Sequence, residues 1–222
     1  FRRYPIGGIM NGGNTSPNGN QQASTDEWKS LAQDFYEESI KTGSNIPILW
    51  GTDAVHGHSN VLGATIFPHN IGLGASANEQ LLEAIGAAVA EEVLATGLYW
   101  TFAPTVTVPQ DYRWGRTYEG FSENPKLVSD IGEAFIKGFQ GEEENFLDEN
   151  HIMATAKHFI GDGGTFKGID KGDTRINESG LKNIHGVPYY AAINACVQSI
   201  MASFNSWNGK KLHGYELSLI HI

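Results

Sequence analysis

The sequence contains one cysteine and no long hydrophobic run, and each shortage excludes a class of protein. A single cysteine, Cys196, cannot form an internal disulfide. It lies in the apolar run 191–197, so we expect it to be a small buried core residue. The longest apolar candidate, 81–104, is interrupted by three glutamates, whereas a bilayer span needs roughly 20 apolar residues. The sequence therefore predicts no membrane-spanning helix.

Charged residues are also scarce, and basic ones are fewest. They make up 18% of the 222 residues, with 15 basic against 25 acidic residues and a formal net charge of −10. This excess of negative charge opposes binding to nucleic acid or to anionic membranes, so we expect neither as a partner. A neutral ligand fits better. The 27 glycines are typical of enzymes with many close strand-to-helix turns.

What the chain has is a regular alternation of strand-like and helix-like segments within one expected domain. The expected strands are 4–10, 46–50, 98–103, 152–159 and 197–204. The expected helices are 25–43, 77–97, 124–138 and 178–195. This alternation indicates an α/β fold with parallel strands, because each crossover helix returns the chain to the same end of the sheet.

Polar residues cluster just after each expected strand. They are Asn11, Asp53, 111–116, Lys157-His158 and Asn205. In a (β/α)8 barrel such positions converge on the face that carries active sites. A doubly wound sheet would gather residues similarly, but the Gly-x-Gly-x-x-Gly fingerprint is absent from the first strand-to-helix turn. We predict an incomplete (β/α)8 TIM-type barrel with about five βα units, so about three units would lie outside this chain.

Asp53 is the first candidate binding residue. It follows an apolar strand, where its carboxylate could accept two hydrogen bonds from adjacent sugar hydroxyls; alternatively, it caps the next turn. His56 and His58 lie close by and could suggest a metal site. No further ligand recurs at a metal-like spacing, so we expect no metal and no other cofactor.

The segment 111–119 holds two arginines, two tyrosines and a tryptophan within nine residues. Aromatic faces stack on pyranose rings while arginine donates to hydroxyls, so this composition suits carbohydrate. We expect Arg113 to brace the loop by pairing with Asp111 or Glu119, and Arg116 to contact the ligand.

Lys157 and His158 end an expected strand and together supply donors and an acceptor for a ligand. Lys157 could instead form a Schiff base, as in a barrel aldolase or lyase. The following Gly161-Asp162-Gly163-Gly164-Thr165 lacks the Gly-Lys-Ser/Thr ending of a phosphate loop. Nucleotide binding is therefore not expected.

Five sequence blocks occur in an order that resembles glycoside hydrolase family 3, in particular its β-glucosidase and exo-1,3/1,4-β-glucanase branch. The resemblance runs from about Tyr4 to Tyr215. The blocks are Gly51-Thr52-Asp53-Ala54-Val55-His56-Gly57, Ala64-Thr65-Ile66-Phe67-Pro68-His69-Asn70, Arg113-Trp114-Gly115-Arg116, Ala156-Lys157-His158-Phe159 and Ser206-Trp207-Asn208-Gly209.

The resemblance implies a retaining exo-hydrolase that releases β-D-glucose from the non-reducing ends of β-glucans or cello-oligosaccharides. By position, Asp53, Arg116, Lys157 and His158 match the family residues that hold the terminal glucose, and Met201 matches a residue lining that subsite. Phe204 stands where the plant exo-glucanase branch usually has tyrosine, so only the packing surface is expected there. The Asp162 loop lacks the His-rich pattern of the β-N-acetylglucosaminidase branch, which disfavours an amino sugar.

The resemblance also implies that the catalytic residues lie outside these 222 residues. The family nucleophile is an Asp in a Ser-Asp-Trp-like motif on a later strand, and the acid/base Glu belongs to a second domain. We expect residues 1–217 to be a partial N-terminal barrel, 218–222 to be a tail unlike the family, and the chain alone to be inactive. The remaining barrel strands and second domain are then partners. A sugar-binding module derived from a hydrolase is the non-enzyme alternative. Family habit suggests a periplasmic or secreted parent.

Overall fold

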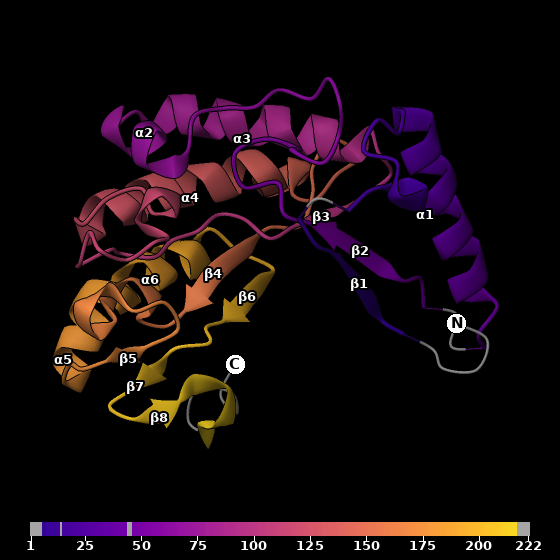
Figure 1. Cartoon of the computed structure of the whole chain (residues 1–222). Helices are drawn as coiled ribbons and strands as arrows, with labels where there is room; N and C mark the ends of the chain where they lie inside the picture. The colour runs from indigo at the N-terminus through magenta and orange to yellow at the C-terminus, as the bar shows by residue number, and fades with distance from the viewer. Residues whose placement is uncertain (1–5, 14, 44–45, 217–222) are drawn as a thin grey trace.

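Five short parallel strands form the frame of the molecule (Figure 1). The computed structural model describes residues 6–13, 15–43 and 46–216. The strands are β1 (Gly8–Asn11), β2 (Leu49–Thr52), β3 (Trp100–Thr101), β4 (Thr155–Phe159) and β6 (Ser199–Ala202). Each overlaps one of the five expected strand segments, and β1 and β2 run one and two residues past the expected ends. The expected residues 4–5 and 218–222 lie outside the described part of the chain.

The strands follow one another in chain order across an open, curved sheet. β1 pairs with β2, and β2 with β3, all parallel. Parallel bridges Trp100↔Met153 and Thr105↔Lys157 carry the sheet from the β3 segment to β4, which pairs in parallel with β6. Within the described residues the strands do not close into a barrel, because β1 and β6 each have one strand neighbour. The observed order is that of consecutive βα units in a partial barrel.

Helices cover the outer face of this sheet (Figure 1). The α-helices are α1 (Thr25–Ile40), α2 (Asn70–Ala75), α3 (Glu79–Leu94), α4 (Pro125–Gln140), α5 (Glu178–Gly180) and α6 (Val187–Asn194), with a π-helical turn at Leu181–Gly186. Short 3₁₀ turns occupy Pro17–Gly19, Thr117–Glu119, Glu143–Asn145, Asp162–Gly164, Phe166–Gly168 and Leu212–Gly214. The four expected helices are confirmed, and α2 is an addition. Among the described residues, no helix is both long and apolar enough to span a membrane.

Local sequence explains where the main helices begin. Ser24 caps α1 in a capping box, because its hydroxyl accepts from the Glu27 N–H and the Glu27 carboxylate accepts from the Ser24 N–H. Asn78 caps α3 and Asn124 caps α4, because the side-chain oxygen of each accepts hydrogen bonds from backbone N–H groups in the first turn of its helix.

The core lies between the sheet and the helices. Trp28 of α1 is fully buried and stacks on Trp50 of β2 with ring centroids 5.7 Å apart. α3 and α4 pack closely through glycines: a Cβ on Gly138 would lie 2.1 Å from the Glu83 carbonyl oxygen. This contact fixes how the two helices lie over the sheet.

A second, small sheet lies beyond the frame and was not expected from the sequence. β5 (Asp173–Thr174) pairs in parallel with β7 (Ser206–Trp207), which pairs antiparallel with β8 (Lys210–Lys211). The β7–β8 turn is Asn208-Gly209, and both residues have positive φ, at 48° and 82°. This is the backbone that a two-residue type I′ hairpin requires.

The prediction for Cys196 was wrong, because its side chain is exposed. Cys196 lies in the turn after α6 with φ of 58°. Its carbonyl oxygen accepts hydrogen bonds from Gln140 and Gln198, so the backbone rather than the thiol is anchored here. Apolar neighbours in the sequence therefore do not bury a residue in the turn that ends the helix.

Candidate functional site

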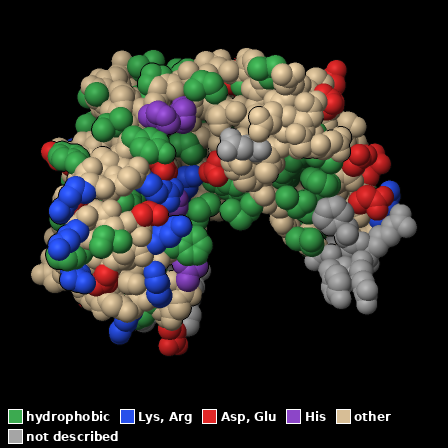
Figure 2. Space-filling model, in the orientation of Figure 1, with side chains coloured by type: hydrophobic (Ala, Val, Ile, Leu, Met, Phe, Trp, Pro, Cys, Tyr) green, Lys and Arg blue, Asp and Glu red, His purple; other side chains and the backbone are tan. Residues whose placement is uncertain are grey.

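Ion-paired side chains meet at the carboxyl ends of β2 and β4, beside the loop 111–119. The space-filling view is hollowed between its two arms, and basic and acidic side chains gather along one side of the hollow (Figure 2). The sheet places this cluster because parallel strands present their carboxyl ends at one edge.

Lys157 and Asp53 form the first pair, although they are 104 residues apart in the sequence. Lys157 Nζ donates to Asp53 Oδ1 at 2.6 Å. The Lys157 side chain is 5% exposed and that of Asp53 is 42% exposed, so the ammonium is buried beneath a carboxylate that reaches solvent. A buried ammonium needs such a partner. The pair thereby offers solvent an oriented acceptor backed by a cation.

Arg116 and Glu119 form the second pair. Arg116 Nε and Nη2 donate to the two carboxylate oxygens of Glu119 at 2.7 and 2.8 Å. These hydrogen bonds, which outweigh partial burial, raise the pKa of Arg116 above its usual range. The two-point contact fixes the plane of the guanidinium. Its Nη2 also lies 3.1 Å from His158 Nε2, so Arg116 joins the ends of the loop and of β4.

His158 is the residue that links the two pairs. It follows Lys157 directly, and the register between β4 and β6 shifts between Lys157 and Phe159, where the Lys157–His158 peptide bond is cis. Burial lowers the pKa of His158; Asp162 opposes this, while the positive charges of Arg116 and Lys157 add to it. His158 is therefore neutral at pH 7.

Met201 and Phe204, the remaining expected site residues, lie on and after β6. Met201 is half-buried and pairs in register with Lys157, so both side chains project from the same face of the sheet. Phe204 is 65% exposed, stacks on His213 at 4.6 Å and has Lys171 Nζ 5.9 Å from its ring centroid. Phe204 is thus an exposed aromatic surface near the carboxyl end of β6.

Arg113 has the bracing role expected from the sequence. Its Nε donates to Asp111 Oδ1 at 2.9 Å and its Nη2 to Asp111 Oδ2 at 2.5 Å. The two arginines of this loop therefore differ in their contacts. Arg113 binds within the loop, whereas Arg116 also contacts His158 of β4.

His56 and His58 diverge despite their spacing. His58 is fully buried, with its ring against Trp28 and its Nε2 3.1 Å from Thr96 Oγ1. His56 instead faces His69, with ring centroids 4.1 Å apart, and its Nδ1 lies 2.8 Å from the Phe67 carbonyl oxygen. Within the described residues no three His, Cys, Asp or Glu side chains are grouped to hold a metal ion.

Glu119 and Asp162 were not identified as site residues from the sequence. Glu119 holds Arg116, and Asp162 lies against His158. Spacing was the available signal: Arg116 and Glu119 are three residues apart, and His158 and Asp162 are four apart. At such short separations a single turn of the chain can bring two side chains together, but the sequence does not show which of them will point toward the site.

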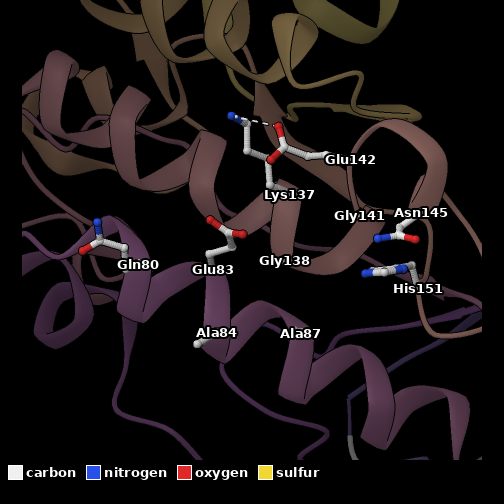
Figure 3. Close-up of a pocket in the computed structure, with 10 residues that line it drawn as sticks. All are labelled: Gln80, Glu83, Ala84, Ala87, Lys137, Gly138, Gly141, Glu142, Asn145 and His151. Atoms are coloured by element: carbon white, nitrogen blue, oxygen red, sulfur yellow. Dashed lines mark ion pairs between the residues drawn. The ribbon is translucent and has the colours of Figure 1, made fainter.

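One cavity adjoins this cluster, and a larger one lies away from it. A cavity of about 180 Å³ adjoins Asp53 and is lined by residues that include His56, His69, Tyr118 and Glu119. Another, of about 440 Å³, lies on the helical layer between α3 and α4 (Figure 3), where Lys137 is paired with Glu142 at 3.0 Å. His151 lines it and precedes β4, so this second cavity belongs to the opposite end of the strand from Lys157 and His158.

Fold and cluster together define a partial, parallel α/β barrel with a cluster of paired polar side chains at the carboxyl ends of its strands. Residues 1–222 match the model of the glycosyl hydrolase family 3 N terminal domain. The chain therefore belongs to glycosyl hydrolase family 3, as the sequence blocks indicated.

Individual relatives agree with this assignment. The exo-1,3/1,4-β-glucanase of a Pseudoalteromonas species, a solved structure, is 52% identical with a TM-score of 0.96, and the match covers 100% of this chain and 28% of that one. A β-xylosidase of Formosa agariphila is 34% identical over 79% of this chain and 24% of its own length. A periplasmic β-glucosidase of Salmonella typhimurium is 35% identical over 74% and 20% respectively. The chain thus spans about a quarter of the length of these relatives.

Proposed function

We propose that this chain forms the part of a retaining, exo-acting β-glucosidase that holds the non-reducing terminal glucose. Asp53, Arg116, Lys157 and His158 bind its hydroxyls, Met201 lines the same subsite, and Phe204 supplies an apolar packing surface. The parent enzyme releases β-D-glucose from β-glucans or cello-oligosaccharides.

One observation carries the proposal: two ion pairs, Lys157–Asp53 and Arg116–Glu119, and the neutral His158 beside Asp162 converge at one edge of the sheet, next to solvent. Lys157 and Arg116 supply only donors, the Asp53 carboxylate only acceptors, and neutral His158 one of each. A sugar hydroxyl both donates and accepts, so a mixed set of fixed donors and acceptors suits it. No member of this set needs a charged ligand.

The same geometry supports binding rather than bond cleavage by these residues. Each of the three carboxylates of the cluster is held by a cation or imidazole: Asp53 by Lys157, Glu119 by Arg116 and Asp162 by His158. A retaining glycosidase needs two carboxyl groups about 5 Å apart, one as nucleophile and one as acid/base. We propose that both come from parts of the parent protein outside residues 1–222, with 1–217 forming the partial barrel domain.

Glucose is favoured over xylose by the most similar of these relatives. The 52% identical structure is an exo-1,3/1,4-β-glucanase, whereas the β-xylosidase is 34% identical. The Salmonella relative is named as periplasmic, which supports a periplasmic or secreted parent.

The aldolase alternative is not favoured. A Schiff base requires a free amine. Lys157 Nζ instead donates to the Asp53 carboxylate, so it is engaged in a hydrogen bond. The family assignment also favours hydrolysis over this chemistry.

Calorimetric titration of the chain with glucose tests the proposal. We expect binding in the millimolar range, and we expect Arg116→Ala to weaken it by about 10- to 150-fold, since a hydrogen bond from a charged group contributes about 1.5–3 kcal/mol. Arg113→Ala is the matched control: it removes an arginine from the same loop that is committed to Asp111.

Absence of any glucose binding by the folded chain would contradict the proposal, as would equal losses in the two arginine variants. Cleavage of p-nitrophenyl β-glucoside by the chain at a rate comparable to a complete family enzyme would contradict the placement of both catalytic carboxyl groups outside it. The non-catalytic binding module would be supported instead if a longer reading frame lacked the Ser-Asp-Trp nucleophile motif.

A further inference from the structure

Asp162 is a buried carboxylate with no role in the function proposed above. It opens the 3₁₀ turn that follows β4 and is only 3% exposed. Its Oδ2 lies 2.8 Å from Nδ1 of His158, and neither atom has a hydrogen-bond partner elsewhere among the described residues. A buried polar atom left unpaired is costly, and a slight turn of the imidazole would join these two. They are therefore each other's natural partners.

The other side of the imidazole decides which nitrogen carries the proton. His158 Nε2 lies 3.1 Å from Nη2 of Arg116. A guanidinium can only donate, so Nε2 must accept and must be unprotonated. Glu119 holds the guanidinium on two points, which fixes the direction of this donor. The single proton of the neutral ring is then on Nδ1, facing Asp162.

We propose that Asp162 is a positioning residue that holds His158 in the Nδ1–H tautomer, so that the one lone pair of Nε2 accepts from Arg116 in the free chain and from a hydroxyl of the bound sugar in its place. The proposal rests on the sugar-binding function above and assigns the direction of one of its hydrogen bonds. Without Asp162, His158 could carry its proton on Nε2, where this N–H would face the Arg116 guanidinium and set two donors against each other.

The charges around His158 give this arrangement a pH dependence. Asp162, Arg116 and Lys157 face the ring, with Glu119 and Asp53 behind the two cations. His185 and Tyr189 are also close enough to Asp162 for its charge to raise their pKa values, against burial for His185 and together with burial for Tyr189. Protonation of His158 would place a third cation beside Arg116 and Lys157 and remove the acceptor at Nε2. Sugar affinity should therefore fall as the pH drops through the pKa of His158.

The tautomer can be measured directly on the wild-type chain. Long-range ¹H–¹⁵N NMR spectra distinguish protonated from unprotonated ring nitrogens, and His158→Asn identifies the signals. We expect a neutral ring protonated at Nδ1 at pH 7. A ring protonated at Nε2, or at both nitrogens, would overturn the proposal.

Asp162→Asn adds a functional readout. The Asp162 charge raises the pKa of His158, and the variant lacks this charge. The fall in glucose affinity on acidification should therefore begin at a lower pH than in wild type. Affinity at pH 7 should fall about tenfold, the loss of one hydrogen bond to a charged group. Uniform weakening at all pH values, with this fall beginning at the same pH as in wild type, would indicate a merely structural role and overturn the proposal.

Asp148→Asn is the matched control. Asp148 Oδ1 lies 2.6 Å from His151 Nδ1 in a similar short-range pair, but His151 precedes the other end of β4. We expect neither the His158 signals nor glucose binding to change in this variant. If the wild-type chain does not bind glucose, the proposed function fails, whereas the tautomer measured in wild type still decides whether Asp162 sets the proton position. The same measurement decides the matter if Asp162→Asn does not fold.

Discussion

Two histidines that lie outside the proposed site make stability depend on pH. His58 and His185 are both buried, and burial lowers the pKa of each to about 4 from an ordinary value of 6.5. In the unfolded chain these two histidines therefore become protonated as the pH falls below 6.5, whereas in the folded chain they become protonated only near pH 4. Stability from the neutral rings is present above pH 6.5 and is lost as the pH falls from 6.5 toward 4.

We expect the free energy of unfolding to decline over this window, and the decline to become shallower in His58→Gln, which removes one of the two groups. Urea unfolding at several pH values measures it. Ser24→Ala is the control: above pH 4.5, the ordinary pKa of its capping partner Glu27, loss of the α1 cap should cost about 1 kcal/mol without changing the slope. A slope equal in His58→Gln and wild type would contradict the assignment.

The residue-scale predictions from sequence succeeded where short-range chemistry was enough. Arg113 braces its loop through Asp111, two residues away, as expected. For Cys196 the apolar neighbours led to the wrong answer, because a residue's exposure depends on which way a turn directs its side chain.

At the scale of elements, the contact between α3 and α4 depends on glycine. A Cβ at position 138 would meet the Glu83 carbonyl oxygen at 2.1 Å, which is backbone and cannot move aside cheaply. We expect Gly138→Ala to lower the free energy of unfolding by about 1–3 kcal/mol through overpacking, although alanine is the better helix former. Chemical denaturation measures the change.

Gly72→Ala in α2 is the matched control, because its Cβ would lie 3.4 Å from Pro68 Cβ, an ordinary contact. It should be neutral or slightly stabilising. Equal stability of the two variants would show that the helices can separate without cost.

The sequence predicted which helices and main strands exist better than it predicted where they end, and it did not predict the small extra elements. The strongly periodic segments predicted all four main helices, because an apolar stripe that must face a sheet has a helical period. The β7–β8 hairpin was missed, although Asn208-Gly209 is the preferred pair for a type I′ turn. Its strands have two residues each, too short to form an alternating pattern.

At the scale of the whole molecule, an apolar groove accompanies the open sheet. It has a volume of about 370 Å³ and is lined by residues of β4, the α5–α6 segment and β7, among them Tyr189, Tyr190, Ile193 and Trp207. Tyr190 and Ile193 are 57% and 56% exposed. In the sheet itself, β6 pairs on one edge with β4, and no other described strand covers its second edge.

We expect the chain on its own to self-associate with rising concentration through this groove and strand edge. Light scattering coupled to size-exclusion chromatography should show a larger monomer fraction when Tyr190→Lys and Ile193→Lys are combined. The control combines Leu62→Lys and Ile66→Lys, an apolar pair on another surface that is also more than half exposed. Similar effects of both double variants would mean that general charge, not this groove, governs association.

The sequence by itself determined the alternation of strands and helices, the parallel frame and the edge at which polar residues collect. These follow from local hydrophobic period and from the fixed geometry of parallel crossovers, which need no knowledge of distant contacts. Only the tertiary structure decided the partners: Lys157 with Asp53, Arg116 with Glu119, and His158 between Arg116 and Asp162. Hydrogen bonding depends on differences of a few tenths of an ångström and on direction. For Lys157 with Asp53 and for Arg116 with His158, such differences arise only when segments far apart in the sequence are brought together.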